Sequence, residues 1–187
     1  INAGVPNKVV SLKDGTMAWH LAGFEVVQGA TRQPPGVSSE SAVLARRVAD
    51  AIAHRMAIRR VDGATLAAWR AEASSRTLYV LDVRTPEEYE AGHVFGMRSA
   101  PGGQLVQETD NYLAIWGARV VLADSDGVRA VMTASWLKQM GWDDVAVIRL
   151  EDIPGERVSG PHRPRALVAV EGVVAGATCA ADGRAAS

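Results

Sequence analysis

The sequence is poor in cysteine: Cys179 is the only one among 187 residues. A single thiol excludes an intramolecular disulfide and any zinc site built on several thiolates. No basic side chain follows Cys179 before Arg184, so nothing in the sequence activates this thiol. We therefore interpret Cys179 as a bystander, and we expect neither a bound metal nor a cofactor.

The sequence also lacks an excess of charge of either sign and lacks a long hydrophobic run. It carries 20 Lys and Arg against 21 Asp and Glu, a formal net charge of -1, so no basic field favours a nucleic acid as partner. The most apolar stretch, residues 166–177, is interrupted by Glu171 and is too short to span a bilayer. Because the N-terminus shows no signal-peptide pattern, we expect a cytoplasmic protein with no membrane partner.

The composition that remains is typical of a soluble globular protein, with 48% hydrophobic and 22% charged residues. A length of 187 residues suffices for one full domain and part of another. The chain opens at Ile1 without methionine, in a stretch that is typical of the end of an element. We therefore expect that sequence upstream of Ile1 has been removed.

Short apolar runs alternate with helical patterns through the middle of the chain. Residues 78–83 and 120–123 are nearly continuous apolar runs, which are typical of parallel strands buried on both faces. We expect further strands at residues 9–12, 58–61 and 145–149, and helices at residues 17–21, 39–56, 86–91, 103–113 and 129–140. This alternation predicts an α/β fold, in which a central parallel sheet is covered by helices on both faces.

Capping residues and apolar spacing support two of these helices. Ser38 or Ser39 can cap the helix at residues 39–56, where Leu44, Val48 and Ile52 recur every four residues and are expected to face inward. Asp62 can cap a further helix, whose Leu66 and Trp69 are expected to face the core.

A weak internal repeat relates the beginning of the chain to its later part. The hexapeptide VVSLKD at residues 9–14 matches VIRLED at residues 147–152, and each follows shortly after a glycine that ends a preceding segment. Residues 31–39 are rich in Pro, Gly and Ser and are typical of a linker. We interpret residues 1–35 as the tail of an earlier copy of the unit.

The first segment with candidate chemistry follows the strand at residues 78–83. Asp82 and Arg84 lie at the carboxyl end of that strand, the edge where open parallel sheets assemble their sites. Pro86 suits the first turn of the helix that follows. His93 is a candidate general base, but a single histidine in a glycine-bracketed stretch is more often a loop residue bonded to backbone. We assign Asp82, Arg84 and His93 a supporting role.

The second segment runs from a buried strand through a tight loop into a helix. This geometry directs backbone N–H groups at one point, which is a prepared site for an anion. Arg129, at the far end of the loop, adds charge and a rigid donor fork. The loop consists of Asp124, Ser125, Asp126, Gly127, Val128 and Arg129.

Together the two segments resemble the rhodanese, or sulfurtransferase, superfamily over about residues 57–153. The first reproduces the family's pattern with Asp82, Val83, Arg84, Glu88, Tyr89, Gly92, His93 and Gly96. The second is similar to its active-site loop of Cys, two residues, Gly, one residue and Arg, with Gly127 and Arg129 at the matching positions. The resemblance implies the three-layer rhodanese fold and a thiosulfate sulfurtransferase as the parent activity.

The departure from the family is at the nucleophile, whose position is occupied by Asp124. Sulfur transfer in this family proceeds through a cysteine persulfide, an intermediate that a carboxylate cannot form. Asp126 adds a second negative charge to a loop that would receive anionic thiosulfate. We expect Asp124 to accept the loop N–H groups itself, so the domain is predicted to be catalytically inactive and to serve as a structural or regulatory module.

The resemblance also organises the chain into parts. Residues 1–35 are similar to the segment that closes a rhodanese domain, residues 36–56 form a linker and helix, and residues 57–157 form the rhodanese-like domain. Residues 158–187 are a tail or the truncated start of a following repeat. The expected partners are other rhodanese repeats of a tandem protein, and a homodimer is a further expectation because partial repeats leave apolar faces uncovered.

A second interpretation of the loop remains open. The run VVLADSDGV also resembles the opening of haloacid-dehalogenase phosphatases, with Asp124 as nucleophile, Asp126 as acid and base, and Mg²⁺ as charge neutraliser. That family needs a lysine and further metal-binding aspartates downstream. Asp143 and Asp144 are the only candidate pair, so this Mg-dependent phosphatase is kept as the alternative.

Overall fold

The computed structural model describes residues 6–29 and 36–162 of the chain. The bystander Cys179 and residues 163–187 of the expected C-terminal tail lie outside the described residues, and so does the apolar stretch at residues 166–177. Within the described ranges, none of the helices combines the length and apolar character needed to cross a bilayer.

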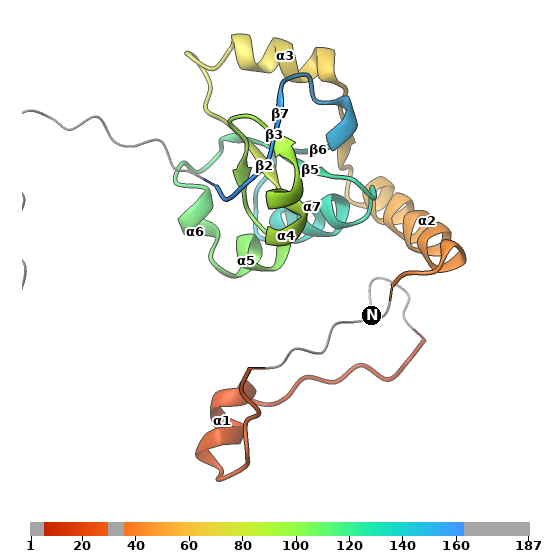
Figure 1. The fold of residues 1–187 in the computed structure, drawn as a ribbon, viewed down its shortest axis with the longest axis vertical. Helices are drawn as coiled ribbons and strands as arrows, with labels where there is room; N and C mark the ends of the chain where they lie inside the picture. The colour runs from red at the N-terminus through yellow and green to blue at the C-terminus, as the bar shows by residue number, and fades with distance from the viewer. Residues whose placement is uncertain (1–5, 30–35, 163–187) are drawn as a thin grey trace, which may run out of the picture.

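A five-stranded parallel sheet forms the centre of the fold, as predicted (Figure 1). Its strands lie in the order β1-β6-β5-β2-β4, and every neighbouring pair is parallel. The strands are β1 (Arg59–Arg60), β2 (Leu78–Asp82), β4 (Arg98–Ser99), β5 (Arg119–Asp124) and β6 (Val145–Arg149). Because β5 and β6 are buried by helices on both faces, their sequences are nearly all apolar.

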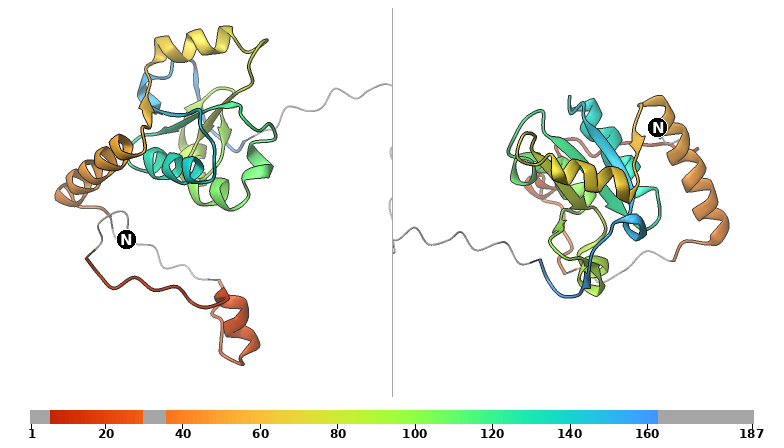
Figure 2. Two further views of the ribbon diagram at one scale, coloured as in Figure 1. Left: turned by 180° about the vertical axis from the view of Figure 1, so that it is seen from behind. Right: turned by 90° about the horizontal axis from the view of Figure 1, so that it is seen from above.

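Two apolar clusters, one on each face of the sheet, make up the core. On one face, α2 (Ser39–Arg55), α5 (Gly102–Gln107) and α7 (Arg129–Gln139) pack against alternate residues of the strands, such as Val120 and Leu122. On the other face, α3 (Gly63–Ala71) packs against Val121 and Ala123 through Leu66 and Trp69. The views from behind and from above show the same layers (Figure 2). The fold is therefore the predicted α/β sandwich with helices on both sides.

Side-chain caps begin three of the helices. Ser38 accepts from the Ser41 N–H at 3.2 Å at the start of α2, and Asp62 accepts from the Thr65 N–H at 2.8 Å at the start of α3. At α4 (Pro86–Ala91), Thr85 forms a reciprocal capping box with Glu88. The caps expected at Ser38 and Asp62 are present, whereas the box at Thr85 was not foreseen.

The expected inward face of α2 is only partly correct. Ile52 is buried, but Leu44 exposes 59% of its surface. The four-residue spacing identifies one face of the helix, yet only its C-terminal half lies over the sheet (Figure 1). The N-terminal half extends beyond the edge, so Leu44 has nothing to pack against.

The single helix expected at residues 103–113 is two short helices, α5 and α6 (Thr109–Tyr112). Glu108 separates them with φ -127° and ψ 50°, which are not helical. The Thr109 hydroxyl, directly after the break, donates to the carbonyl oxygens of Leu105 and Val106. This local hydrogen bonding competes with a continuous helix.

A second, antiparallel pair of strands was not expected from the sequence. It consists of β3 (His93–Val94) and β7 (Arg157–Val158), each of two residues. A two-residue strand is too short to show a period, and its partner is distant in sequence. A single-turn helix, η1 (Leu150–Asp152), connects β6 toward β7.

The strand expected at residues 9–12 is wrong for this structure. Residues 6–29 contain only α1 (Gly15–Leu21) and lie apart from the sheet (Figure 1). No strand among the described residues lies beside the residues before α1 to form a ladder with them, so the apolar pattern alone does not make them a strand. Val10 exposes 75% of its surface as a result.

We predict that Gly63→Ala lowers the free energy of unfolding by about 1–3 kcal/mol. A methyl group on Gly63 would lie 2.4 Å from the backbone oxygen of Asp152, so α3 or η1 has to move. Urea denaturation followed by circular dichroism measures the change. Gly103→Ala is the matched control, because nothing lies within 4 Å of its added methyl group. Equal stability of the two variants would contradict the prediction.

Candidate active-site loop

The loop lies at the carboxyl edge of the sheet. Asp124 is the last residue of β5, and the sheet register pairs it with Arg149 at the end of β6. Asp82 ends the neighbouring strand β2, whose register pairs it with Ala123. The parallel topology therefore places Asp82 and Asp124 at the same edge of the sheet. It also brings Arg149 to this edge, a residue that the sequence analysis did not predict.

The Asp124 side chain is turned into the loop and not toward solvent. Its Oδ1 accepts the Gly127 N–H at 2.9 Å, and its Oδ2 accepts the Ala130 N–H at 2.8 Å. Gly127 has a φ of +74°, which a residue with a side chain rarely adopts. Only 1% of the Asp124 surface is exposed. Its carboxylate therefore occupies the centre of the loop, where it accepts the backbone N–H groups of Gly127 and Ala130.

Asp126 uses the next two donors of the loop. Its Oδ1 accepts the N–H groups of Val128 at 2.8 Å and Arg129 at 3.1 Å. The Arg129 Nε donates to Asp126 Oδ2 at 2.6 Å. Four backbone N–H groups between residues 127 and 130 thus bind the protein's own two carboxylates. These donors are satisfied without any ligand.

Arg129 is held by a second carboxylate. Glu88, in the first turn of α4, accepts from both terminal nitrogens of the Arg129 guanidinium, with Nη2 at 3.1 Å from Oε1. The hydrogen bond from Arg129 lowers the pKa of Glu88 to about 2, against the effect of burial. The same bond raises the pKa of Arg129. Since Glu88 and Asp126 flank its guanidinium, Arg129 is an internal ion-pair partner and not an open anion binder.

Asp82 and Arg84 form a buried, bidentate ion pair behind the loop. The Arg84 Nε donates to Asp82 Oδ1 at 3.0 Å, and its Nη2 donates to Oδ2 at 2.7 Å. The same Nη2 donates to the carbonyl oxygen of Gly92 at 2.7 Å. The pair therefore joins the end of β2 to the chain that enters β3. The supporting role of both residues at the loop stays a prediction.

His93 does not join this group. It lies on β3, where its Nδ1 is 2.9 Å from the Tyr89 carbonyl oxygen and its ring stacks on the Tyr89 ring at a centroid distance of 3.7 Å. It lines a separate hollow of about 520 Å³ with Tyr89 and His162. The bond to the Tyr89 oxygen matches the interpretation of His93 as a residue bonded to backbone, although His93 is in a short strand and not in a loop. Its supporting role at the site stays a prediction.

The two aspartates of the loop titrate differently. Burial raises the pKa of Asp124 to about 6, and the side-chain hydrogen bond to Asp126 and the charge of Asp126 act in the same direction. Burial also disfavours the Asp126 carboxylate, but the hydrogen bond with Asp124 and the N–H groups of Val128 and Arg129 outweigh it and lower the pKa of Asp126. Asp126 is therefore the more firmly ionised of the two.

We predict that the protein loses stability as the pH rises from about 4.5 to about 6. The folded chain binds a proton at Asp124 with a pKa of about 6, compared with an ordinary value of 3.8, so deprotonation disfavours the folded state. A difference of this size corresponds to up to about 3 kcal/mol. Glu88 has the opposite sign, but its contribution is lost only as the pH falls from 4.5 toward 2.

Urea denaturation across this pH range measures the effect. Asp124→Asn has no titrating group at this position and should not show the decline. A decline that persists in Asp124→Asn, or stability that rises between these pH values in the unsubstituted chain, would contradict the assignment of the raised pKa to Asp124.

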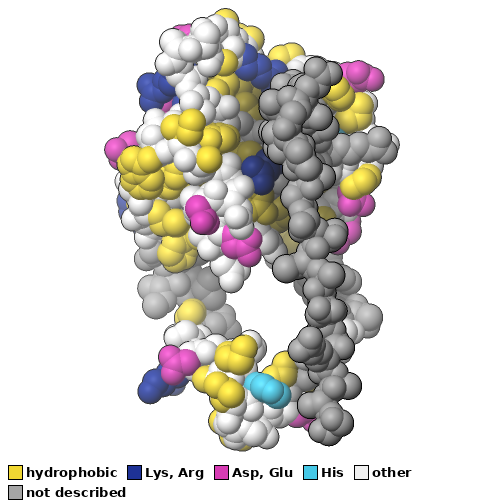
Figure 3. Space-filling view, turned by 90° about the vertical axis from the view of Figure 1, so that its left-hand side faces the viewer, with side chains coloured by type: hydrophobic (Ala, Val, Ile, Leu, Met, Phe, Trp, Pro, Cys, Tyr) yellow, Lys and Arg dark blue, Asp and Glu magenta, His cyan; other side chains and the backbone are white. Residues whose placement is uncertain are grey.

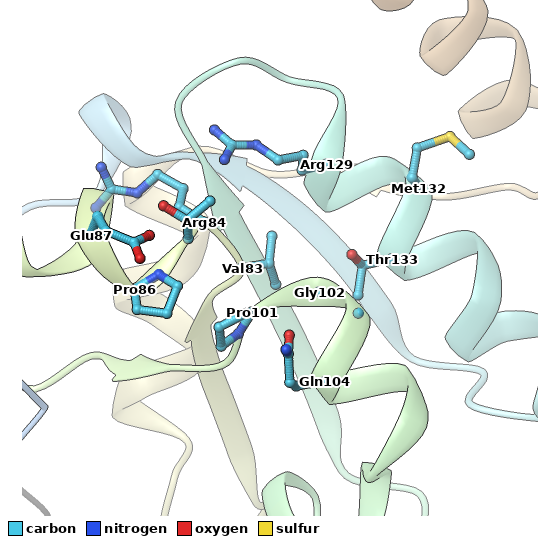
Figure 4. A pocket seen from close by; sticks show the side chains of 12 residues that line it. Val83, Arg84, Pro86, Glu87, Pro101, Gly102, Gln104, Arg129, Met132 and Thr133 are labelled. Atoms are coloured by element: carbon cyan, nitrogen blue, oxygen red, sulfur yellow. The ribbon is translucent and has the colours of Figure 1, made fainter. Parts of the chain in front are cut away.

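Among the described residues, hollows of two sizes border the loop. The larger, of about 470 Å³, lies among the starts of α4, α5 and α7, with Arg129, Gln104 and Thr133 among the residues that line it (Figure 4). Asp124 does not line it. The hollow that does touch Asp124 has a volume of only about 160 Å³ and is bordered by Arg149. The position expected for a nucleophile is therefore in the smaller hollow.

The sequence analysis did not identify Arg149, and it gave Glu88 no role at this loop. Arg149 Nη2 donates to the Ser125 carbonyl oxygen at 2.8 Å, so β6 supports the loop from the side. Its Nε is buried and makes no hydrogen bond within the described part of the chain. Sites in parallel sheets form at the carboxyl ends of the strands, and this rule pointed to the ends of β2 and β5. Applied to β6, the same rule would have identified Arg149. The Thr85 to Glu88 capping spacing was the available signal for Glu88.

The described residues contain no group of three or more His, Cys, Asp or Glu side chains arranged to hold a metal ion. Asp143 and Asp144, the only downstream pair considered for Mg²⁺, precede β6. They thus lie at the amino edge of the sheet, opposite Asp124. A five-residue strand separates the two edges by about 16 Å.

The chain is similar to solved structures of rhodaneses. A thiosulfate sulfurtransferase from Pseudomonas aeruginosa matches with 51% identity and a TM-score of 0.77, over 88% of this chain and 32% of that one. A rhodanese from E. coli matches with 24% identity and a TM-score of 0.40, over 45% of this chain and 100% of that one. The chain thus spans about a third of the length of the Pseudomonas protein. No curated protein matches it.

A family model identifies the same region as the sheet and the loop. Residues 64–150 match the Rhodanese-like domain. This range runs from the start of α3 to the end of β6 and includes both sequence segments that first indicated the family. The chain therefore contains a rhodanese-like, sulfurtransferase-type domain at residues 64–150.

Proposed function

We propose that this rhodanese-like domain does not transfer sulfur and acts as a structural or regulatory module of a multi-repeat protein. The observation that carries the proposal is the occupied loop. Asp124, at the family's nucleophile position, accepts the N–H groups of Gly127 and Ala130, and Asp126 accepts those of Val128 and Arg129. The donors that would stabilise a bound anion are already used.

The chemistry of the carboxylate supports the same conclusion. In sulfur transfer a thiolate attacks the sulfane sulfur of thiosulfate, the bond between the two sulfurs breaks, and sulfite leaves with the electron pair. The resulting persulfide then passes its outer sulfur to an acceptor such as cyanide. An aspartate has no sulfur with which to hold that intermediate, and Asp124 is almost completely buried. Thiosulfate would also meet the negative charge of Asp126.

Two observations support the multi-repeat part of the proposal. One is the internal repeat of residues 9–14 at residues 147–152, and the other is the greater length of the matching sulfurtransferase. The sulfurtransferase from Pseudomonas aeruginosa is about three times as long as the part that this chain matches. We propose that the domain lies beside other rhodanese repeats of a cytoplasmic protein, one or more of which carry the catalytic cysteine. The balanced charge and the single cysteine support this placement.

The phosphatase alternative lacks support from the site geometry. Its acid and base, Asp126, is held by Arg129 and by two backbone N–H groups. The downstream aspartates lie at the other edge of the sheet, where Asp144 pairs with Arg59, Arg76 and Arg119. We therefore keep the inactive rhodanese-like module as the proposed function.

A steady-state assay tests the proposal. With thiosulfate and cyanide as substrates, the chain should form thiocyanate no faster than a buffer blank, because no residue of the loop can hold the transferred sulfur. Thiocyanate formation at ordinary enzyme rates would overturn the proposal. Phosphate release from an aryl phosphate with Mg²⁺, abolished in Asp124→Asn, would favour the phosphatase instead.

A further inference from the structure

Residues 6–29, here called the N-terminal segment, carry an apolar surface that nothing in the described structure covers. In the space-filling view, hydrophobic side chains gather on this separate lower part of the molecule (Figure 3). The segment is nevertheless locally ordered: the Trp19 and Phe24 rings contact at a centroid distance of 4.5 Å, and Trp19 Nε1 donates to the Glu25 oxygen at 2.9 Å. Its exposed apolar residues are Val9, Val10, Leu12, Met17, Trp19, Leu21, Phe24 and Val27.

The internal repeat assigns a role to the first part of this surface. Residues 9–14 match residues 147–152, with identical residues at Val9 and Val147, at Leu12 and Leu150, and at Asp14 and Asp152. The second copy is the end of β6 followed by η1, and its apolar residues are buried. In the first copy the matching residues are exposed, at 52% for Val9 and 53% for Leu12. The same apolar pattern is therefore buried in the second copy and exposed in the first.

The sheet of this chain has no place for the first copy. The position that the repeat indicates is between β1 and β5, and β6 already occupies it through ladders on both sides. In a second copy of this chain, β6 fills the same position between β1 and β5, so a dimer would not provide an open position for residues 9–12. The partner must be a different sheet, one that still lacks the strand corresponding to β6.

We infer that residues 7–11 form the last strand of a preceding rhodanese-like domain of the same protein, with α1 and residues 22–27 packed on that domain. This inference rests on the multi-repeat part of the proposed function and names the partner of the N-terminal segment. The partner surface is the open edge between two parallel strands with apolar residues on both faces, because both Val9 and Val10 would be buried on opposite faces.

Amide hydrogen exchange compares residues 1–187 alone with the longer protein in which they are encoded. The inference predicts exchange at least about 100-fold slower for the amides of Val9 and Val10 in the longer protein, because their N–H groups enter a sheet ladder. Equal exchange in the two samples would overturn it. So would protection of the isolated chain that depends on its concentration, because a second copy would then be the partner.

A pair of variants in the longer protein tests the same inference by stability. Val10→Asp should remove the melting transition of the preceding domain and leave that of residues 57–157 unchanged. Ile115→Asp is the matched control, an exposed apolar residue on the sheet domain, and it should leave both transitions in place. A preceding domain that melts normally in Val10→Asp would contradict the assigned strand.

The failures of the two proposals can be told apart. A reading frame with no rhodanese-like sequence ahead of Ile1 would overturn the inference, and one with no other rhodanese-like repeat on either side would overturn the multi-repeat module as well. An upstream repeat without protection of Val9 and Val10 would overturn the inference alone. Thiocyanate formation by residues 1–187 would overturn the proposed inactivity and leave the strand assignment intact.

Discussion

Asp124→Cys is expected to form a persulfide with thiosulfate at position 124, where the unsubstituted chain is expected to form none. The new thiol would lie at the end of β5, where Asp124 now accepts the N–H groups of Gly127 and Ala130. Donors at the start of a helix favour the thiolate over the thiol, so the substituted residue should be nucleophilic near neutral pH. We expect thiocyanate formation at least about 100-fold above the Asp124→Ser variant.

Two further substitutions make this experiment specific. Cys179→Ser in every variant removes the native thiol, so a mass increase of one sulfur atom reports on position 124 alone. Asp126→Asn, added to Asp124→Cys, removes the charge that repels thiosulfate and should raise kcat/KM by about 10-fold. An Asp124→Cys variant that folds normally and forms no persulfide would show that the loop is not a rhodanese cradle.

Asp82→Ala is expected to give the largest loss of stability, about 3–5 kcal/mol in the free energy of unfolding. Asp82 exposes 0% of its surface, and its carboxylate is the bidentate partner of the buried Arg84 guanidinium. Removing the carboxylate leaves that cation desolvated, with only the Gly92 carbonyl oxygen as a remaining acceptor. Urea denaturation at neutral pH measures the loss.

The chain contains a matched control for this prediction. Asp50 and Arg60 form an ion pair whose side chains are largely exposed, so Asp50→Ala should cost less than about 1 kcal/mol. The double variant with Asp82→Ala and Arg84→Ala should lose less than the sum of its parts, because no buried charge is left alone. Similar losses for Asp82→Ala and Asp50→Ala would contradict the importance of burial.

Much of the fold follows from local pattern. The apolar runs that became β2 and β5 are long enough to identify buried parallel strands, and the polar residues after them mark the edge of the sheet. The position of Asp124 in the loop follows from its spacing to Gly127 and Arg129. These features depend on residues close together in sequence, which is why they are visible without a structure.

What the sequence did not reveal depends on distant contacts. The hydrogen bond from Arg149 to the Ser125 oxygen requires the register between β5 and β6, and the hydrogen bond from Arg129 to Glu88 requires α4 to lie beside α7. The exposure of Leu44 depends on where α2 extends past the sheet. Residues 9–12 have the apolar pattern of a strand but do not form one, because a strand also needs a neighbouring strand to supply hydrogen bonds.

The amide protons of Gly127 and Ala130 give the most direct test that the loop is occupied from within. In a ¹⁵N-labelled chain, both resonances should shift together as the pH passes about 6, the pKa of Asp124, because its two oxygens accept both bonds. Millimolar thiosulfate at neutral pH should leave both resonances unmoved. Saturable thiosulfate-induced shifts at these two amides, with no response to pH, would show instead that the loop is open to an external anion.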